Sequence, residues 1–117
     1  MNFDDSVRDL LECCPGATVA AIVDPDGIPV VVYPFTPELE TLGAELAAMI
    51  GEINAAGREL DHGAMRQFSV TTEKAQIVLT TMSGGYFLVL LLDCDAVTGK
   101  ACFQSRLTGE RLYSEFV

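Results

Sequence analysis

Basic side chains are scarce in this chain of 117 residues, which carries 7 lysines and arginines against 17 aspartates and glutamates. The few cations lie singly along the sequence and form no cluster. Affinity for nucleic acid and for anionic membranes comes mainly from clustered Lys and Arg. We therefore expect neither nucleic acid nor a membrane surface as a partner. The formal charge of −10 is interpreted as an aid to solubility or, alternatively, as steering toward a basic patch on a protein partner.

Long apolar runs are also missing. The longest, Tyr86 to Leu92, is far shorter than the roughly 20 residues that a membrane helix needs. The sequence starts Met1-Asn2-Phe3-Asp4-Asp5, which is acidic where a secretory signal is basic and then apolar. We therefore expect a cytoplasmic protein with no membrane insertion.

Residues that build common active sites are few. Tryptophan is absent, His62 is the only histidine, and no two cysteines form a CxxC pair. A lone histidine without suitable cysteine or carboxylate spacing gives no metal site, and no serine lies in a GxSxG elbow. The sequence therefore predicts a protein that is not an enzyme, with no catalytic residue, no cofactor and no metal. The cysteines are expected to be buried thiols in a reducing compartment: Cys13, Cys14, Cys94 and Cys102.

Three short motifs resemble ligand sites but fit other interpretations better. Thr98-Gly99-Lys100 is similar to the end of a phosphate-binding loop, but Cys94 stands where a glycine is needed and Ala101 replaces the Ser or Thr. Ser83-Gly84-Gly85 and Asp24-Pro25-Asp26-Gly27 each separate two predicted strands, where such residues form turns. None of the three motifs supports a catalytic function.

Apolar periodicity predicts a single domain over residues 1–117 in the order helix, two strands, helix, three strands, helix. The last predicted strand is apolar on both faces, so helices must cover both faces of the sheet. The predicted fold class is therefore a mixed helix and sheet domain, α/β in the broad sense and α+β in detail. The first expected element is a short helix that is capped within Asp4-Asp5-Ser6 and carries Val7 to Cys14. The others are strands Thr18–Val23 and Ile28–Tyr33, a helix from Pro37 to Gly57 or Arg58, strands Arg66–Thr71, Ala75–Thr81 and Tyr86–Leu92, and a helix Lys100–Phe116.

Several single residues refine this prediction. Pro29 cannot donate to a strand ladder, so its strand is expected to begin near an edge or to turn the proline nitrogen away from a neighbouring strand. Thr36 is the expected N-cap of the long helix, with Pro37 at the first helical position. Gly109 is expected to interrupt the last helix. The strand Arg66–Thr71 alternates apolar and polar residues, which predicts one wetter face and, at a sheet edge, pairing with a second copy.

The long helix carries more apolar surface than a single sheet contact needs. Its larger apolar residues recur in alternating steps of three and four, and small residues lie beside them. Either both sets merge into one wide stripe under the sheet, or one face packs on the sheet and the other on the same helix of a second protomer. The residues that recur at this spacing are Leu39, Leu42, Leu46, Met49, Ile53, Ala56 and Leu60, of which only Ala56 is small.

Over nearly its whole length the chain resembles the Roadblock family of dynein light-chain-type domains, which in bacteria includes the mutual gliding-motility B proteins. The resemblance rests on the element order and on the spacing of four motifs: Pro15-Gly16, Asp24-Pro25-Asp26-Gly27, the alanine-rich helix Leu39 to Gly57, and Ser83-Gly84-Gly85-Tyr86-Phe87-Leu88-Val89. It implies the Roadblock/longin-like order α-β-β-α-β-β-β-α, with a five-stranded antiparallel sheet, the long helix on one face and the terminal helices on the other.

The resemblance also implies a function. Members of this family form homodimers through the long helix and the third strand, and the paired long helices bind a small Ras-like GTPase and often tune its nucleotide cycle. For the dimer contact we expect Leu42, Leu46, Met49, Ile53, Phe68 and Val70, of which some must face the protomer's own core. For the partner contact we expect Glu38, Glu45, Glu52 and Arg58, with His62 nearby.

Two other functions stay open at this point. One is a small sensory domain of PAS-like or profilin-like build that holds a ligand between its sheet and helices. The other is a structural adaptor that has no effect on nucleotide turnover.

Overall fold

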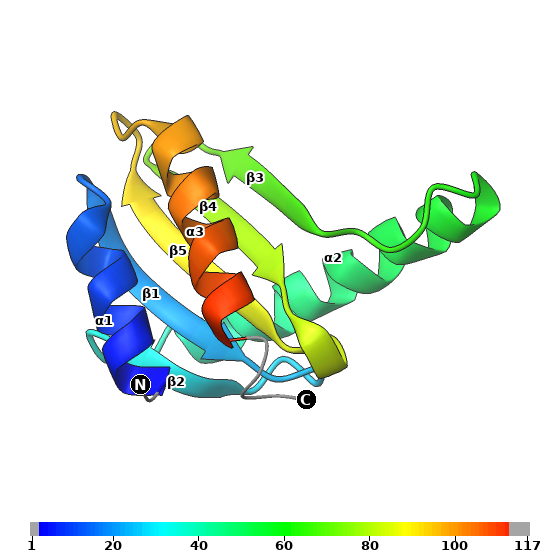
Figure 1. The fold of residues 1–117 in the computed structure, drawn as a ribbon, viewed down its shortest axis with the longest axis horizontal. Helices are drawn as coiled ribbons and strands as arrows, with labels where there is room; N and C mark the ends of the chain where they lie inside the picture. Colours follow the sequence, from blue (N-terminus) through cyan, green and yellow to red (C-terminus); the bar gives the residue numbers. More distant parts are fainter. Residues whose placement is uncertain (1–2, 113–117) are drawn as a thin grey trace.

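A computed structural model describes residues 3–112, which form one antiparallel sheet with helices on both faces (Figure 1). The strand order across the sheet is β2-β1-β5-β4-β3. The elements are α1 (Phe3–Cys13), β1 (Ala17–Val23), β2 (Pro29–Tyr33), α2 (Leu39–Glu59), β3 (Gln67–Thr71), β4 (Ala75–Thr81), a short 3₁₀ turn η1 (Ser83–Gly85), β5 (Phe87–Asp93) and α3 (Thr98–Leu112).

The predicted order of elements and the five-stranded antiparallel sheet are confirmed. Figure 1 shows α1 and α3 side by side on one face and α2 on the other. Helices lie on both faces because the central strand β5 has no polar face: its apolar residues from Phe87 to Leu90 are all buried. A strand without a polar face is stable only when both faces are covered.

Two apolar cores result, one on each face. The α1/α3 face contains Leu10, Ile22, Val78 and Leu88, each at most 1% exposed. The α2 face contains Leu39, Leu46, Leu79 and Val89, together with half-buried residues around them. Each core joins a helix to the central strands.

The two sheet edges are β2 and β3. The prediction from Pro29 is confirmed, because β2 pairs with β1 alone among the described strands. In β3, Phe68 packs on the α2 side, whereas the amide of Gln67 reaches the α3 side and donates to the Cys102 carbonyl at 2.9 Å. The alternation predicted for this strand is therefore confirmed.

Two helix predictions need correction. Helix α2 begins at Leu39 with Glu38 as its N-cap, whereas the Thr36 hydroxyl donates to the Pro34 carbonyl and caps nothing. Gly109 does not interrupt α3, which runs unbroken from Thr98 to Leu112 with Gly109 buried inside it. The part of the predicted last helix after residue 112, with Tyr113 and Phe116, lies outside the described residues.

Helix α2 is fixed to the sheet by a close approach of two backbones. Gly27 in the β1–β2 turn has φ +88° and lies against Gly43 and Ala44 of α2. A Cβ on Gly43 would stand 2.6 Å from the Gly27 carbonyl oxygen, so only glycine fits there. This contact sets where α2 crosses the sheet.

Candidate functional site: the long helix and the third strand

One side of α2 is used by the protomer's own core. Leu39, Gly43 and Leu46 are buried against the sheet, and Leu42 and Ile50 are half-buried beside them. This sheet-facing stripe follows the helical repeat of three and four residues.

The opposite side of α2 is exposed and carries only small side chains along its centre. Its central line consists of small residues at helical spacing, all of them exposed: Ala48, Gly51 and Ala55. Beside this line, exposed glutamates recur every seventh residue, which places them on one flank of the helix: Glu38, Glu45, Glu52 and Glu59. A second backbone can therefore approach this side closely, next to an acidic flank.

The C-terminal half of α2 extends beyond the sheet on the side where β3 lies (Figure 1). The apolar side chains on this half are incompletely covered: Met49 is 38% exposed, Leu60 is 64% exposed, and Ile53 is half-buried. A helix end that carries apolar residues past its own sheet leaves them without a cover inside the protomer.

The projecting end of α2 is nevertheless well ordered by its local contacts. The Met65 backbone N–H donates to the Asn54 side-chain oxygen at 2.7 Å. Gly57 leaves room for the Gly63 carbonyl, which a Cβ would meet at 2.4 Å. The connection to β3 therefore folds back on the helix and holds its end in place.

The sheet has an incompletely covered row of its own on the same face. Val70 of β3 lies opposite Ile77 of β4, Ile77 lies opposite Leu91 of β5, and Leu91 lies opposite Val19 of β1. In this apolar row Val70, Ile77 and Leu91 are half-buried. The neighbouring row through Leu79 and Val89 is buried under α2. Helix α2 thus covers one row of this face and leaves the next one partly open.

The structure sorts the predicted site residues into two groups. Leu46 is 2% exposed in the protomer's own core, so we remove it from the dimer contact. Leu42 and Phe68 also pack on this core but stay half-buried, whereas Met49, Ile53 and Val70 border the open apolar surface. The polar candidates all lie exposed on or just before α2, as does His62 after it: Glu38, Glu45, Glu52 and Arg58.

Sequence reasoning missed three members of this surface. Ile77 and Leu91 sit in strands that look like ordinary core strands, and only the register with Val70 places them in one row. Glu59 was detectable, because it continues the seven-residue spacing of the other glutamates on α2.

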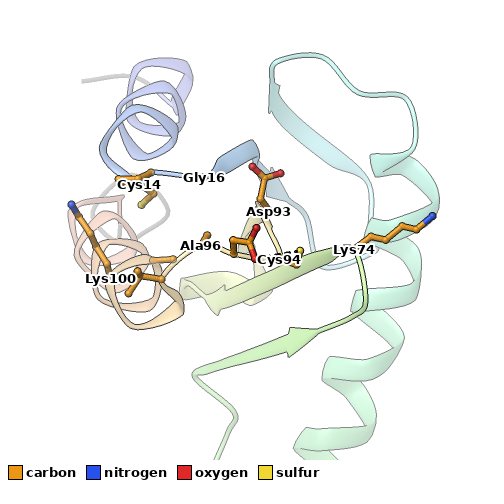
Figure 2. A pocket seen from close by; sticks show the side chains of 11 residues that line it. Cys14, Gly16, Lys74, Asp93, Cys94, Ala96 and Lys100 are labelled. Carbon is orange, nitrogen blue, oxygen red and sulfur yellow. Dashed lines mark hydrogen bonds between the residues drawn. The ribbon is translucent and has the colours of Figure 1, made fainter.

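A separate hollow of about 480 Å³ lies at the C-terminal end of β5, between the end of α1, the start of α3 and the β3–β4 turn (Figure 2). Lys74 and Lys100 border it, but their side chains extend away from its centre in opposite directions, and Asp93 and Asp95 also line it. Burial raises the pKa of the Cys14 thiol to about 12, with a smaller contribution from Cys13, so Cys14 is no nucleophile at neutral pH.

The wall of this hollow is held by Gln76. Its side-chain nitrogen donates to the Asp93, Cys94 and Ala96 carbonyls at 3.2, 3.0 and 2.8 Å, and its side-chain oxygen accepts from the Thr98 hydroxyl. Gln76 therefore shapes the connection into α3, which is a structural role.

The prediction that the cysteines are buried is confirmed for Cys14 alone. Cys13 and Cys94 are exposed, Cys102 is half-buried, and only Cys14 is buried. Within residues 3–112 no three His, Cys, Asp or Glu side chains come together to hold a metal ion. None of the helices in that same range is long and apolar enough to cross a membrane.

The comparison with family models agrees with this architecture. The Roadblock/LC7 domain model matches residues 3–92, which is most of the chain. The chain belongs to the Roadblock/LC7 domain family. The search of curated proteins finds no match.

Solved Roadblock structures share the fold at low sequence identity. A Roadblock/LC7 domain from Streptomyces avermitilis superposes with a TM-score of 0.88 at 19% identity, covering 98% of each chain. The gliding protein MglB from Thermus thermophilus gives 0.85 at 20% identity, covering 96% of this chain and 86% of that one. MglC from Myxococcus xanthus gives 0.68 at 28% identity, covering 98% and 99%.

Proposed function

We propose that this Roadblock protein is a non-catalytic homodimer that binds and regulates a small Ras-like GTPase through its paired long helices. The observation that carries the dimer is the match between two incompletely covered surfaces on one face. The projecting half of α2 carries Met49, Ile53 and Leu60, and the sheet beside it carries the row Val70, Ile77 and Leu91.

In a dimer whose two-fold axis lies beside β3, both surfaces are covered at once. Each α2 that projects past its own β3 edge then lies over the open row of its partner's sheet. The outer edge of β3, which has no partner strand among the described residues, pairs with the second β3 and joins the two sheets. One symmetric contact therefore buries the helix end, the sheet row and the strand edge.

The mass of the protein in solution tests the dimer. We expect wild-type protein to sediment at twice the chain mass of 12.6 kDa. Met49→Asp places a charge in the contact, and we expect it to sediment as a folded monomer. Val97→Asp is the matched control, since Val97 is exposed before α3 and should leave the dimer intact. A wild-type protein that stays monomeric at high micromolar concentration contradicts the proposal.

The acidic flank of α2 supplies the partner surface in this proposal. In the dimer, two such flanks lie on one face, and they favour a GTPase surface rich in Lys and Arg. The small-residue line lets that partner approach the helix backbones. Catalysis stays with the GTPase, whose hydrolysis depends mainly on the positioning of groups around the phosphate.

The partner contact is tested with the small Ras-like GTPases of the same genome, each loaded with a GTP or a GDP analogue. We expect one of them to bind, and Glu45→Lys with Glu52→Lys to weaken that binding about tenfold through like-charge contacts. Asp9→Lys on exposed α1 is the matched control. Binding without any change in GTP hydrolysis identifies a structural adaptor instead of a regulator, and no binding by any of them contradicts the proposal.

The two cores of the domain do not favour a small ligand enclosed between the sheet and the helices. Both of these spaces are filled by apolar side chains, of which Ile22, Leu79, Leu88 and Leu90 are fully buried.

A further inference from the structure

A second incompletely covered surface lies at the other edge of the sheet. A groove of about 550 Å³ separates β2 from the first turns of α2. Two of its large apolar residues are strongly exposed, Ile28 at 60% and Phe35 at 82%. The apolar lining of this β2–α2 groove includes Ile28, Val30, Val32, Phe35, Leu39 and Ala44.

The β2–α2 groove is preformed. Its turn end is closed by the backbone contact of Gly27 with Gly43, described above. The turn itself is fixed by the Asp24 carboxylate, which accepts hydrogen bonds from the backbone N–H groups of Asp26 and Ile28, both at 2.9 Å. A ligand therefore meets a shaped surface and does not have to order these segments, which favours binding.

The strand that borders this groove has an unprotected edge. Strand β2 reads Pro-Val-Val-Val-Tyr and carries no charged residue, and its outer edge faces no strand in the described part of the chain. Edge strands usually avoid unwanted pairing through charges, proline or bulges. Here Pro29 and the register shift beside Val23 protect only the end next to the turn. The remaining backbone groups can pair with an added strand.

The charge around the groove has one sign. Asp26 and Glu40 line it and no lysine or arginine does, and Glu38 lies between the lining residues Pro37 and Leu39 in the sequence. In the part of the chain that the structure describes, neither Asp26 nor Glu40 forms an ion pair. A ligand with basic side chains compensates these carboxylates.

We propose that the β2–α2 groove binds an extended segment of a partner protein, in which apolar residues alternate with lysine or arginine. The segment adds a strand to the outer edge of β2. Its apolar side chains enter the groove beside Val30 and Phe35, and its basic side chains approach Asp26 and Glu40. This site is at the sheet edge opposite β3, so it does not depend on the proposed dimer.

A second copy of the chain is a poorer occupant. Pairing two β2 strands brings together two grooves that carry the same carboxylates, and like charges at short range repel. The chain also has no segment in which apolar residues alternate with several cations, because its seven lysines and arginines lie singly. Complementary charge therefore favours a different protein.

Selection from a library of random peptides displayed on phage tests the site with the full chain as bait. We expect enriched peptides in which Lys or Arg alternates with Val, Ile or Phe. A synthetic copy of the enriched peptide should bind Phe35→Ala at least about tenfold more weakly than wild type, because a strongly exposed aromatic side chain is a typical hot spot. Phe103→Ala is the matched control, since Phe103 is an exposed phenylalanine on α3 and should leave binding unchanged.

Further variants test the edge and the charge. Val30→Lys should abolish binding of the basic peptide, and Asp26→Asn with Glu40→Gln should weaken it several-fold and reduce its salt dependence. Met49→Asp should leave peptide affinity unchanged, which separates this site from the dimer. The proposal is overturned if no binder is recovered, or if the enriched peptides are acidic or lack the alternation. It is also overturned if the peptide binds Phe35→Ala as tightly as wild type. A fall in the mass of the protein in solution on Val30→Lys would overturn it too, because β2 would then pair with a second copy of the chain.

Discussion

The two faces of the sheet differ in how completely the protomer covers them. Two helices, α1 and α3, cover one face, and the core beneath them includes the fully buried Ile22, Leu88 and Leu90. One helix, α2, covers the other face, crosses only part of it and then projects past β3. The first face has a fully buried central core within one chain, whereas the second leaves Ile77 and Leu91 partly open.

Polar contacts strengthen the same contrast. On the α1/α3 side, Gln67 ties β3 to α3 and Gln76 ties β4 to the connection before α3. On the α2 side, the exposed line of Ala48, Gly51 and Ala55 makes no such contacts and presents bare backbone. The α1/α3 face is therefore held by polar contacts within the chain, and the exposed side of α2 lacks them.

The largest expected effect comes from truncating a side chain in the core of the α1/α3 face. Leu88→Ala removes a fully buried side chain beneath α1 and α3, and we expect it to lower the free energy of unfolding by about 3 kcal/mol. Leu60→Ala on the projecting end of α2 should cost less than about 1 kcal/mol in a monomeric Met49→Asp background. Urea denaturation followed by circular dichroism measures both, and equal costs would contradict the contrast between the faces.

Two glycines of α2 sharpen the comparison within a single helix. Gly43→Ala places a Cβ 2.6 Å from the Gly27 carbonyl, and we expect a loss of about 2 to 3 kcal/mol as the backbones separate. A Cβ on Gly51 meets nothing within 4 Å, so Gly51→Ala should stabilise the monomeric background by about 0.5 to 1 kcal/mol. Thermal unfolding of both variants in that background gives the sign, and a destabilising Gly51→Ala would mean that this side of α2 is covered within the protomer.

Much of the fold follows from local sequence features. Strand alternation, turn residues such as Asp24 and Gly27, and the two apolar faces of β5 predict the elements and the presence of helices on both faces. Pro29 correctly marks an edge strand because its effect is a backbone effect that needs no tertiary information. The start of α2 was misplaced because Thr36 has the side chain of an N-cap but forms its hydrogen bond to Pro34 instead.

The candidate site depends more on tertiary contacts. The spacing of Leu42, Leu46 and Met49 predicts one stripe, but the angle at which α2 crosses the sheet decides that Leu46 is buried and Met49 is partly exposed. That angle is set by the approach of Gly27 to Gly43, which joins residues far apart in the sequence. Gly109 is likewise buried beside Thr80 of β4, and helix α3 continues through it.

A smaller effect is expected from the polar contacts that complete the α1/α3 side. Gln76→Leu keeps the side-chain size but removes the amide that bonds three backbone carbonyls, and we expect a loss of about 1 to 2 kcal/mol. Hydrogen exchange should become faster at the start of α3 and stay unchanged in α2. Gln104→Leu on α3 is the control, and an equal loss of stability there would show that Gln76 has no special role.

The smallest effect concerns the Cys14 thiol beneath α1. Because burial raises its pKa to about 12, we expect iodoacetamide at pH 8 to label exposed Cys13 and Cys94 well before Cys14, as measured by peptide mass spectrometry. The unfolded chain ionises Cys14 near the ordinary value of 9.0, so this residue leaves stability unchanged below that pH and lowers it increasingly between pH 9.0 and about 12. Urea midpoints of wild type should therefore fall more steeply between pH 8 and pH 10 than those of Cys14→Ala. Equal dependence of the urea midpoint on pH in both proteins, or labelling of Cys14 as fast as Cys94, would mean that this thiol contacts water. The α1/α3 face would then be less well covered than its contrast with the α2 face requires.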